Sequence, residues 1–257
     1  MPQSSIRMSD LDTIRIEEMT WPMVKKALGE GYRTVIVPVG SIEQHGPHLP
    51  TGTDAFAGDA FGLRVAEKLG KALVAPTIRP GCSEHHMDFP GTITISPETL
   101  IRVLIDVCDS LDRHGFENII LIPTHGGNFA PVATATQIIA PKLKANLIAL
   151  TDLGGLISKM NEAMAEFGVS AEASGAHSGA AETSLMMAYK PELVREGEET
   201  VGYMGPLTSK YVRAGFKAVT PTGVFGDATK ASRQAGDRII ELVTEMYVEN
   251  IKRELES

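Results

Sequence analysis

Side chains that commonly bind metal ions collect in two short loops of the chain. Glu43, His45 and Asp54 lie within the glycine- and proline-rich stretch 40–54, and His125 follows a separate apolar run. Glu43 and His45 are two residues apart, so an extended segment points both side chains to the same side. Neutral imidazole together with carboxylate is a good ligand set for zinc, manganese or ferrous iron. Each residue alone has an ordinary structural explanation, so the prediction of a metal site depends on their combination.

A third polar cluster, from His177 to Thr183, adds one more candidate ligand. Glu182 in this cluster would complete a set of five ligands, which is enough for two ions if one carboxylate bridges them. Asp54 is flanked by small residues that allow close approach. We therefore expect Asp54 to be the bridging ligand.

The elements that position these loops are predicted from apolar periodicity. The β-branched run 34–39 and the apolar run 118–123 read as buried strands, and the two loops follow them directly. Residues 55–69 and 97–114 carry apolar stripes at helical spacing, and Ser96 and Pro97 mark the start of the second helix. Strands that alternate with helices form parallel sheets, whose carboxyl edge collects ligand-binding loops. The fold class predicted is α/β, αβα-layered, with a mostly parallel sheet and helices on both faces.

The rest of the chain is predicted in less detail. Further strands are expected at 73–76 and 147–150, a helix at 129–144, and a closing helix along the apolar side that includes Ile239 and Val243. The stretches 155–175 and 190–226 have no readable periodicity and are expected to form loops, the second with short strands. No linker or repeat divides the chain, so residues 1–257 are predicted to form a single domain.

Composition excludes several classes of protein. A hydrophobic content of 43% argues against disorder, and the net charge of 24 − 32 = −8 argues against nucleic-acid or anionic-membrane partners. The two cysteines form no redox or zinc-finger motif. Residues 1–18 contain no apolar leader, and no apolar run is long enough to cross a membrane. We expect a cytoplasmic protein without nucleic-acid or membrane partners.

Three segments of the chain resemble the creatininase (creatinine amidohydrolase) family. The run from Gly40 to Asp54 matches the pattern E-x-H-G-x-H-L-P followed by T-D, and the segments 125–128 and 177–184 match two further parts. The match covers residues from about 18 to 190. The resemblance implies an αβα-layered fold, two divalent metal ions per subunit, hydrolysis of non-peptide C–N bonds in small amides, and a homo-oligomer, commonly a hexamer.

The resemblance also implies roles for individual residues. The metal ligands would be Glu43, His45, Asp54, His125 and Glu182, with Asp54 bridging. His177 would correspond to a family histidine placed for proton transfer. The segment 81–92 resembles the family's H-x-x-F-P-G-T stretch, which would place His86 at the border of the substrate pocket.

Two departures from creatininase proper argue against creatinine as the substrate. Creatininase has a glutamate where this chain has Gly127, so the fifth ligand must come from elsewhere, and Glu182 is the candidate. Creatininase closes its pocket with tryptophans in the second half of the chain, whereas the one tryptophan here, Trp21, precedes the first motif. The H-G-G-N sequence is more similar to branches that hydrolyse formamides in flavin and deazaflavin synthesis, trim the mycofactocin precursor, or open a cyclic ketose in inositol breakdown.

The reaction expected is attack of a metal-bound hydroxide on the carbonyl carbon of a small amide, formamide or cyclic amide. Backbone N–H groups of Gly126 and Gly127 would hold the developing oxyanion. His177 would give a proton to the leaving nitrogen, and Glu182 would act either as a ligand or as a proton shuttle. Two alternatives stay open: a metal-dependent hydrolase that opens a cyclic ketose at a C–C bond, and a non-catalytic metal-binding protein. Zinc is the ion most expected, with manganese or iron(II) as alternatives.

Overall fold

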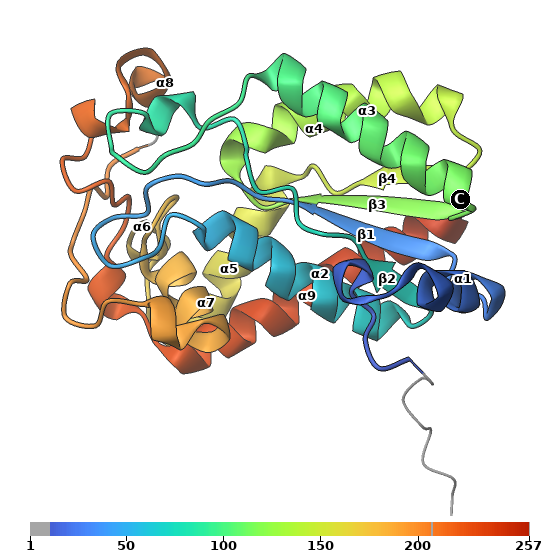
Figure 1. The fold of residues 1–257 in the computed structure, drawn as a ribbon. Coiled ribbons are helices and arrows are strands. Elements are labelled where there is room, and N and C mark those ends of the chain that lie inside the picture. Colours follow the sequence, from blue (N-terminus) through green and yellow to red (C-terminus); the bar gives the residue numbers. More distant parts are fainter. Residues whose placement is uncertain (1–10, 207, 257) are drawn as a thin grey trace, which may run out of the picture.

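The computed structural model describes residues 11–206 and 208–256, and its centre is a parallel sheet (Figure 1). The strands are β1 (Thr34–Val39), β2 (Ala72–Val74), β3 (Asn118–Pro123) and β4 (Asn146–Ala149). Their order in the sheet is β2-β1-β3-β4, and every neighbouring pair is parallel. The predicted α/β fold class is therefore confirmed.

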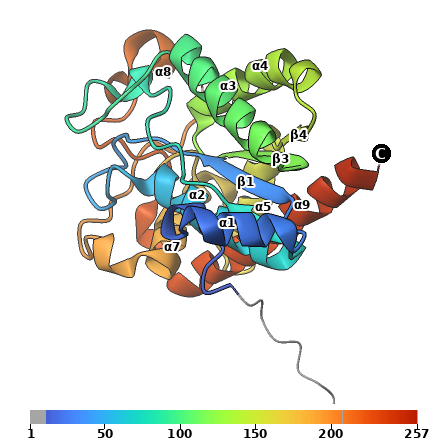
Figure 2. The ribbon, with the colours of Figure 1, turned by 45° about the vertical axis from the view of Figure 1, so that its right-hand side comes forward.

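Helices cover both faces of this sheet, as Figures 1 and 2 show. Alternate strand residues point to opposite faces: Ile36 and Ile120 join one apolar cluster, while Val35 and Ile119 join the other. The first cluster is completed by α2 (Thr53–Leu69), α5 (Leu153–Ala165), α7 (Ala180–Tyr189) and α9 (Arg233–Glu256). The second is completed by α1 (Trp21–Gly29), α3 (Pro97–His114) and α4 (Phe129–Ile139). The sheet thus lies between two helical layers.

The ends of α3 follow from its sequence. The Ser96 hydroxyl accepts a hydrogen bond from the Thr99 N–H at 3.2 Å, and Pro97 occupies the first helical position. Gly115 ends the helix in the left-handed conformation, with φ of 92°. Both ends lie where the sequence predicts them.

Three predicted segments differ from the structure. The helix expected at 129–144 ends at Ile139 and continues as a short 3-10 turn, because Pro141 cannot donate the next helical hydrogen bond. The stretch 155–175, expected to be loop, is mostly helical: α5 begins after Asp152, whose side chain accepts from the Gly155 N–H, and α6 (Ala171–Ser174) follows. The stretch 190–226 contains α8 (Lys210–Ala214) and isolated bridges rather than short strands.

The C-terminal helix α9 packs very closely on α7. A Cβ atom at Gly236 of α9 would overlap the backbone carbonyl oxygen of Ser184 in α7. Only glycine permits this approach. The contact fixes the position of α7, which carries Glu182 on its first turn.

Within residues 11–206 and 208–256, no helix has both the length and the apolar character needed to cross a membrane. The expectation that no secretory leader is present concerns residues 1–18, and residues 1–10 lie outside the described part of the chain.

Candidate metal centre

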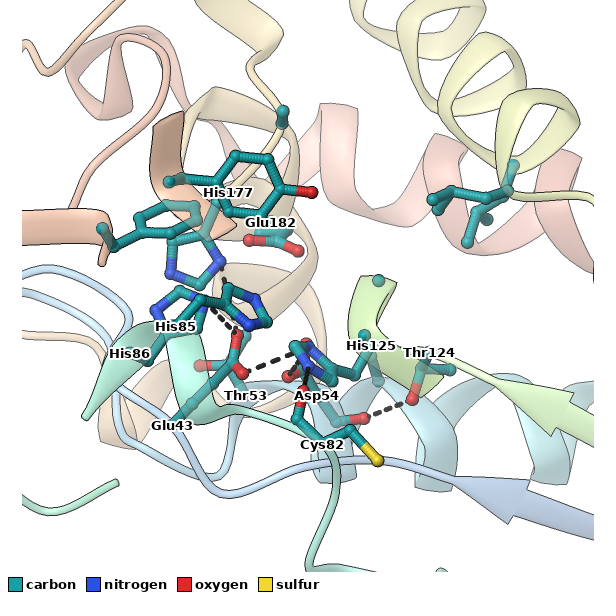
Figure 3. A pocket seen from close by; sticks show the side chains of 18 of the residues that line it. Glu43, Thr53, Asp54, Cys82, His85, His86, Thr124, His125, His177 and Glu182 are labelled. Atoms are coloured by element: carbon teal, nitrogen blue, oxygen red, sulfur yellow. Dashed lines mark hydrogen bonds and ion pairs between the residues drawn. The ribbon is translucent and has the colours of Figure 1, made fainter. Parts of the chain in front are cut away.

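Glu43 lies at the centre of a buried group of histidines beyond the end of β1 (Figure 3). Its Oε2 atom is 3.1 Å from His125 Nδ1, and its Oε1 atom is 3.3 Å from His86 Nε2 and 3.6 Å from His177 Nδ1. His125 follows β3, so the loops after two neighbouring parallel strands converge at one edge of the sheet as predicted.

Asp54 lies between His125 and His45. It stands in the first turn of α2, whose N-terminus favours a carboxylate. Its Oδ2 atom is 3.3 Å from His125 Nδ1, and its Oδ1 atom is 3.5 Å from His45 Nε2. Thr124 holds the same turn by donating its hydroxyl to the Asp54 backbone carbonyl at 2.7 Å. One carboxylate therefore faces both predicted ligand histidines.

Glu182 reaches the group from α7, far along the chain. Its Oε2 atom is 3.6 Å from His45 Nε2 and accepts the Ser178 N–H at 2.5 Å. The five residues predicted as metal ligands thus come together in the structure. Three sets of three side chains have ligand-type atoms within 4.8 Å of one another: Glu43, His45 and His177; Glu43, Asp54 and His125; His45, Asp54 and Glu182.

Several of these atoms are buried without a hydrogen-bond partner among the described residues. They are both carboxylate oxygens of Glu43, Nε2 of His45 and Oδ2 of Asp54. Burying such groups unpaired costs free energy that a bound cation would offset. The donor set of carboxylate and imidazole therefore fits a divalent metal ion.

The histidine rings are oriented by hydrogen bonds to backbone carbonyls. His45 donates from Nδ1 to the Glu43 carbonyl at 3.2 Å, and His125 donates from Nε2 to the Cys82 carbonyl at 3.1 Å. His177 donates from Nε2 to the Gln44 carbonyl at 2.8 Å. When such a ring is neutral, its second nitrogen carries a free electron pair and faces the carboxylates. Backbone partners of this kind orient metal-binding histidines in proteins.

Gln44 is a site residue that the sequence analysis missed. Its side-chain nitrogen donates to His86 Nδ1 at 2.9 Å and to the Gly223 carbonyl at 3.2 Å, while its oxygen accepts the Gly46 N–H at 2.9 Å. His86 consequently has its N–H, not an electron pair, on the side of Glu43, although its geometry there does not make a hydrogen bond to either carboxylate oxygen. A signal was present, because Gln44 lies between Glu43 and His45, but an amide side chain by itself predicts no chemistry.

The charged groups shift one another's pKa strongly. Burial opposes the charged form of His45, but the carboxylates of Asp54 and Glu182 outweigh it and raise the pKa of His45 to about 10. Burial raises the pKa of Glu182 to about 7. Burial and the neighbouring His45 and His86 hold the pKa of His177 well below its ordinary value. The carboxylates of Glu43 and Asp54 likewise outweigh burial and raise the pKa of His125 well above its ordinary value. Without an ion, the protons in this cluster therefore reside on His45 and His125 rather than on His177.

The loop around Gly127 has no room for a side chain. A Cβ atom there would overlap the Cys82 carbonyl oxygen and lie 2.6 Å from His125 Nε2, in the space of the hydrogen bond between them. At Gly126 a Cβ would meet nothing within 4 Å. Trp21 lies on α1, 76% exposed, and does not line the cavity beside the cluster.

The cluster opens into a cavity of about 870 Å³. His86, Gly126 and Gly127, the predicted substrate-binding residues, line it. The ring of His86 also stacks on Phe216, with 4.2 Å between centroids. Part of the wall comes from α5, a helix that the sequence analysis did not expect. The spacing of the apolar residues Leu153, Leu156, Ile157 and Met160 was the available signal.

Comparisons with known proteins agree with this architecture. Residues 17–251 match the family model described as Creatininase, creatinine amidohydrolase. The chain is 32% identical to the mycofactocin precursor peptide peptidase of Mycolicibacterium smegmatis, over 85% of this chain and 84% of the relative. It is 27% identical to the creatinine amidohydrolase of Pseudomonas putida, over 94% and 97% of the two chains. A solved structure of a mutant creatininase, Zn-Zn type, superposes with a TM-score of 0.81 at 25% identity and covers 95% of this chain and 99% of its own.

Proposed function

Because the chain belongs to the creatininase family, we propose that it is a metal-dependent amidohydrolase that cleaves the C–N bond of a small amide or peptide-like substrate. One observation carries the proposal: Asp54 is shared by two sets of buried ligand-type side chains. An arrangement with a shared carboxylate suits two ions acting on one substrate.

We assign the ligands according to these sets. Glu43, Asp54 and His125 would hold one ion, and His45, Asp54 and Glu182 the other, with Asp54 bridging. Zinc is the expected ion, and manganese or iron(II) would suit the same donors. When bound, such ions lower the pKa of water toward about 7 and polarise a carbonyl oxygen.

The remaining side chains would orient the substrate and move protons. Water adds its oxygen to the carbonyl carbon, the C–N bond breaks, and the nitrogen leaves with a proton. His177 is placed to carry that proton, because Nδ1 faces the cluster while Nε2–H is held by the Gln44 carbonyl. The N–H groups of Gly126 and Gly127 are proposed to stabilise the developing oxyanion, and His86 to contact the substrate.

Metal content tests the ligand assignment. Purified wild-type protein should carry two ions, Asp54→Asn should lose both, and Glu182→Gln should lose one, as measured by elemental analysis. Glu84→Gln is the matched control, since Glu84 lines the cavity but belongs to none of the three sets. Unchanged metal content in Asp54→Asn would overturn the assignment.

Turnover separates the role of His177 from metal binding. His177→Asn should keep the ions and lower kcat by about 10²- to 10⁴-fold. Turnover is measured on a panel of candidate substrates that contains formamides, lactams, short peptides and inososes. This panel separates amide hydrolysis from C–C cleavage of a cyclic ketose. Bound metal without hydrolysis of any member would support a non-catalytic protein instead.

We also expect a cytoplasmic homo-oligomer, a hexamer in the first instance. Light scattering after size-exclusion chromatography would measure the number of subunits.

A further inference from the structure

The cavity beside the candidate metal centre continues along an apolar wall that the proposed chemistry does not use. Five residues of α5 line it: the apolar Leu153, Leu156, Ile157 and Met160, and the polar Asn161. Their spacing places them on one stripe of the helix. Phe61 of α2 and Leu185 of α7 line the same cavity. The wall therefore joins directly to the elements that carry Asp54 and Glu182.

Part of the apolar surface of this wall is not covered by other side chains among the described residues. Leu156 is 6% exposed, whereas Leu153, Ile157 and Met160 are only half-buried. Apolar surface left uncovered beside a reactive centre is typical of a pocket that buries a ligand.

The charges of the residues that line the cavity indicate which kind of ligand fits there. Among the described residues that line the cavity there is no lysine or arginine, and Glu84 adds a carboxylate outside the metal-ligand sets. A negatively charged group placed along α5 would find no cation to pair with, and burial there would cost free energy. A positively charged group would meet the apolar side chains of α5 and the uncharged amide of Asn161, with no carboxylate among them. An uncharged group fits best.

We propose that the substrate carries an uncharged apolar arm, aliphatic or aromatic, that lies along Leu153, Leu156, Ile157 and Met160 while its amide group lies at the metal centre. The inference rests on the proposed function, because it takes the metal centre as the site of the reacting amide. The cavity volume of about 870 Å³ is within the range of pockets that enclose molecules much larger than a simple amide.

A series of alkyl hydroxamates tests the arm without requiring turnover. The hydroxamate group binds divalent ions, so its position is fixed while the chain is lengthened from acetohydroxamate through hexanohydroxamate to octanohydroxamate. Calorimetry on the zinc-loaded protein should give a Kd that falls about three- to fourfold per added methylene. A hexyl chain ending in a carboxylate should lose most of this gain.

Variants locate the arm on α5. The double substitution Ile157→Thr and Met160→Gln should flatten the dependence on chain length while leaving the Kd of acetohydroxamate unchanged. Ser158→Ala is the matched control, because Ser158 is an exposed residue of the same helix that does not line the cavity. Val212 of α8 also lines the cavity, so Val212→Thr tests whether the alkyl chain of the hydroxamate extends toward α8 instead.

The outcomes separate failure of this inference from failure of the proposed function. Equal Kd values for short and long hydroxamates on wild-type protein would contradict the proposed apolar arm, but they would not contradict the proposed metal centre. Loss of the chain-length dependence in Val212→Thr, but not in the α5 double variant, would also overturn it. If no hydroxamate binds to protein exposed to zinc, the metal centre itself is wrong, and both proposals fail together.

Discussion

Protons and metal ions compete for the same nitrogen atoms in this site. The carboxylates around His45 and His125 outweigh the effect of burial and raise the pKa of both histidines, that of His45 to about 10. In the ion-free protein at neutral pH, both rings therefore hold a second proton. Those protons stabilise the ion-free fold fully below pH 6.5, the ordinary pKa of the unfolded histidine. The contribution of His45 is lost as the pH rises through about 10, and that of His125 is lost at a pH well above 6.5.

This competition predicts proton release on metal uptake. Binding of zinc to ion-free protein should release on the order of one to two protons, and the apparent affinity should rise with pH between about pH 6 and about pH 9. Calorimetry in two buffers of different ionisation enthalpy measures the number of protons released. A heat of binding that is independent of the buffer would mean that the rings are already neutral, and the electrostatic description would be wrong.

At the scale of elements, the turn after β3 is shaped around His125. Residues Gly126–Asn128 form a 3-10 turn that leads into α4, and the His125 ring bonds to the Cys82 carbonyl across it. Gly127 lies against that hydrogen bond, while Gly126 faces open space. The two adjacent glycines therefore have different structural roles.

A matched pair of substitutions exploits this difference. Gly127→Ala should displace His125, lower metal affinity by about 10- to 100-fold, and destabilise the fold by about 1–3 kcal/mol. Gly126→Ala should leave metal affinity close to wild type. Competition with a chromogenic chelator measures the affinity, and urea unfolding measures the stability. Equal metal affinity in the two variants would contradict the role assigned to the His125 ring contact.

The sequence predicted the strands and the site loops well, and it failed at α5. The strands β1 and β3 are short β-branched and apolar runs that end at glycine or at a polar loop, which leaves few alternatives. The first turn of α5 contains Gly154 and Gly155, whose low helix propensity hides the apolar stripe of this helix. Its stability comes from the Asp152 cap and from packing into the cluster that includes α9, and packing is invisible in a single sequence.

At the scale of the whole molecule, the candidate metal centre depends on how α7 and α9, from the C-terminal part of the chain, pack on each other and on α2. Residue types and positions after strands were enough to name Glu43, Asp54 and His125. The distance of 3.6 Å between Glu182 and His45 follows from the docking of α7, which loop spacing cannot predict. That docking depends in turn on the close contact between Gly236 of α9 and the Ser184 carbonyl.

Substitution at this contact should affect the fold and the site together. Gly236→Ala should destabilise the protein by about 1–3 kcal/mol and lower occupancy of the ion assigned to His45, Asp54 and Glu182, because α7 must shift. Gly154→Ala is the control, since a Cβ there meets only a carboxylate oxygen of Asp152 at 3.5 Å. Urea unfolding and elemental analysis measure the two effects. A destabilised Gly236→Ala protein with full metal content would show that α7 position and ion binding are independent.

The two ligand sets that share Asp54 are completed at different times during synthesis of the chain. The set of Glu43, Asp54 and His125 is complete in the part of the chain that ribosomes synthesise first, whereas the set with Glu182 waits for α7. Metal binding that requires α7 to be docked contributes its free energy to that docking. Depletion of metal should therefore loosen α7 and α9 before the sheet, and hydrogen exchange would record the sequence of events as local opening at the C-terminal end of the fold.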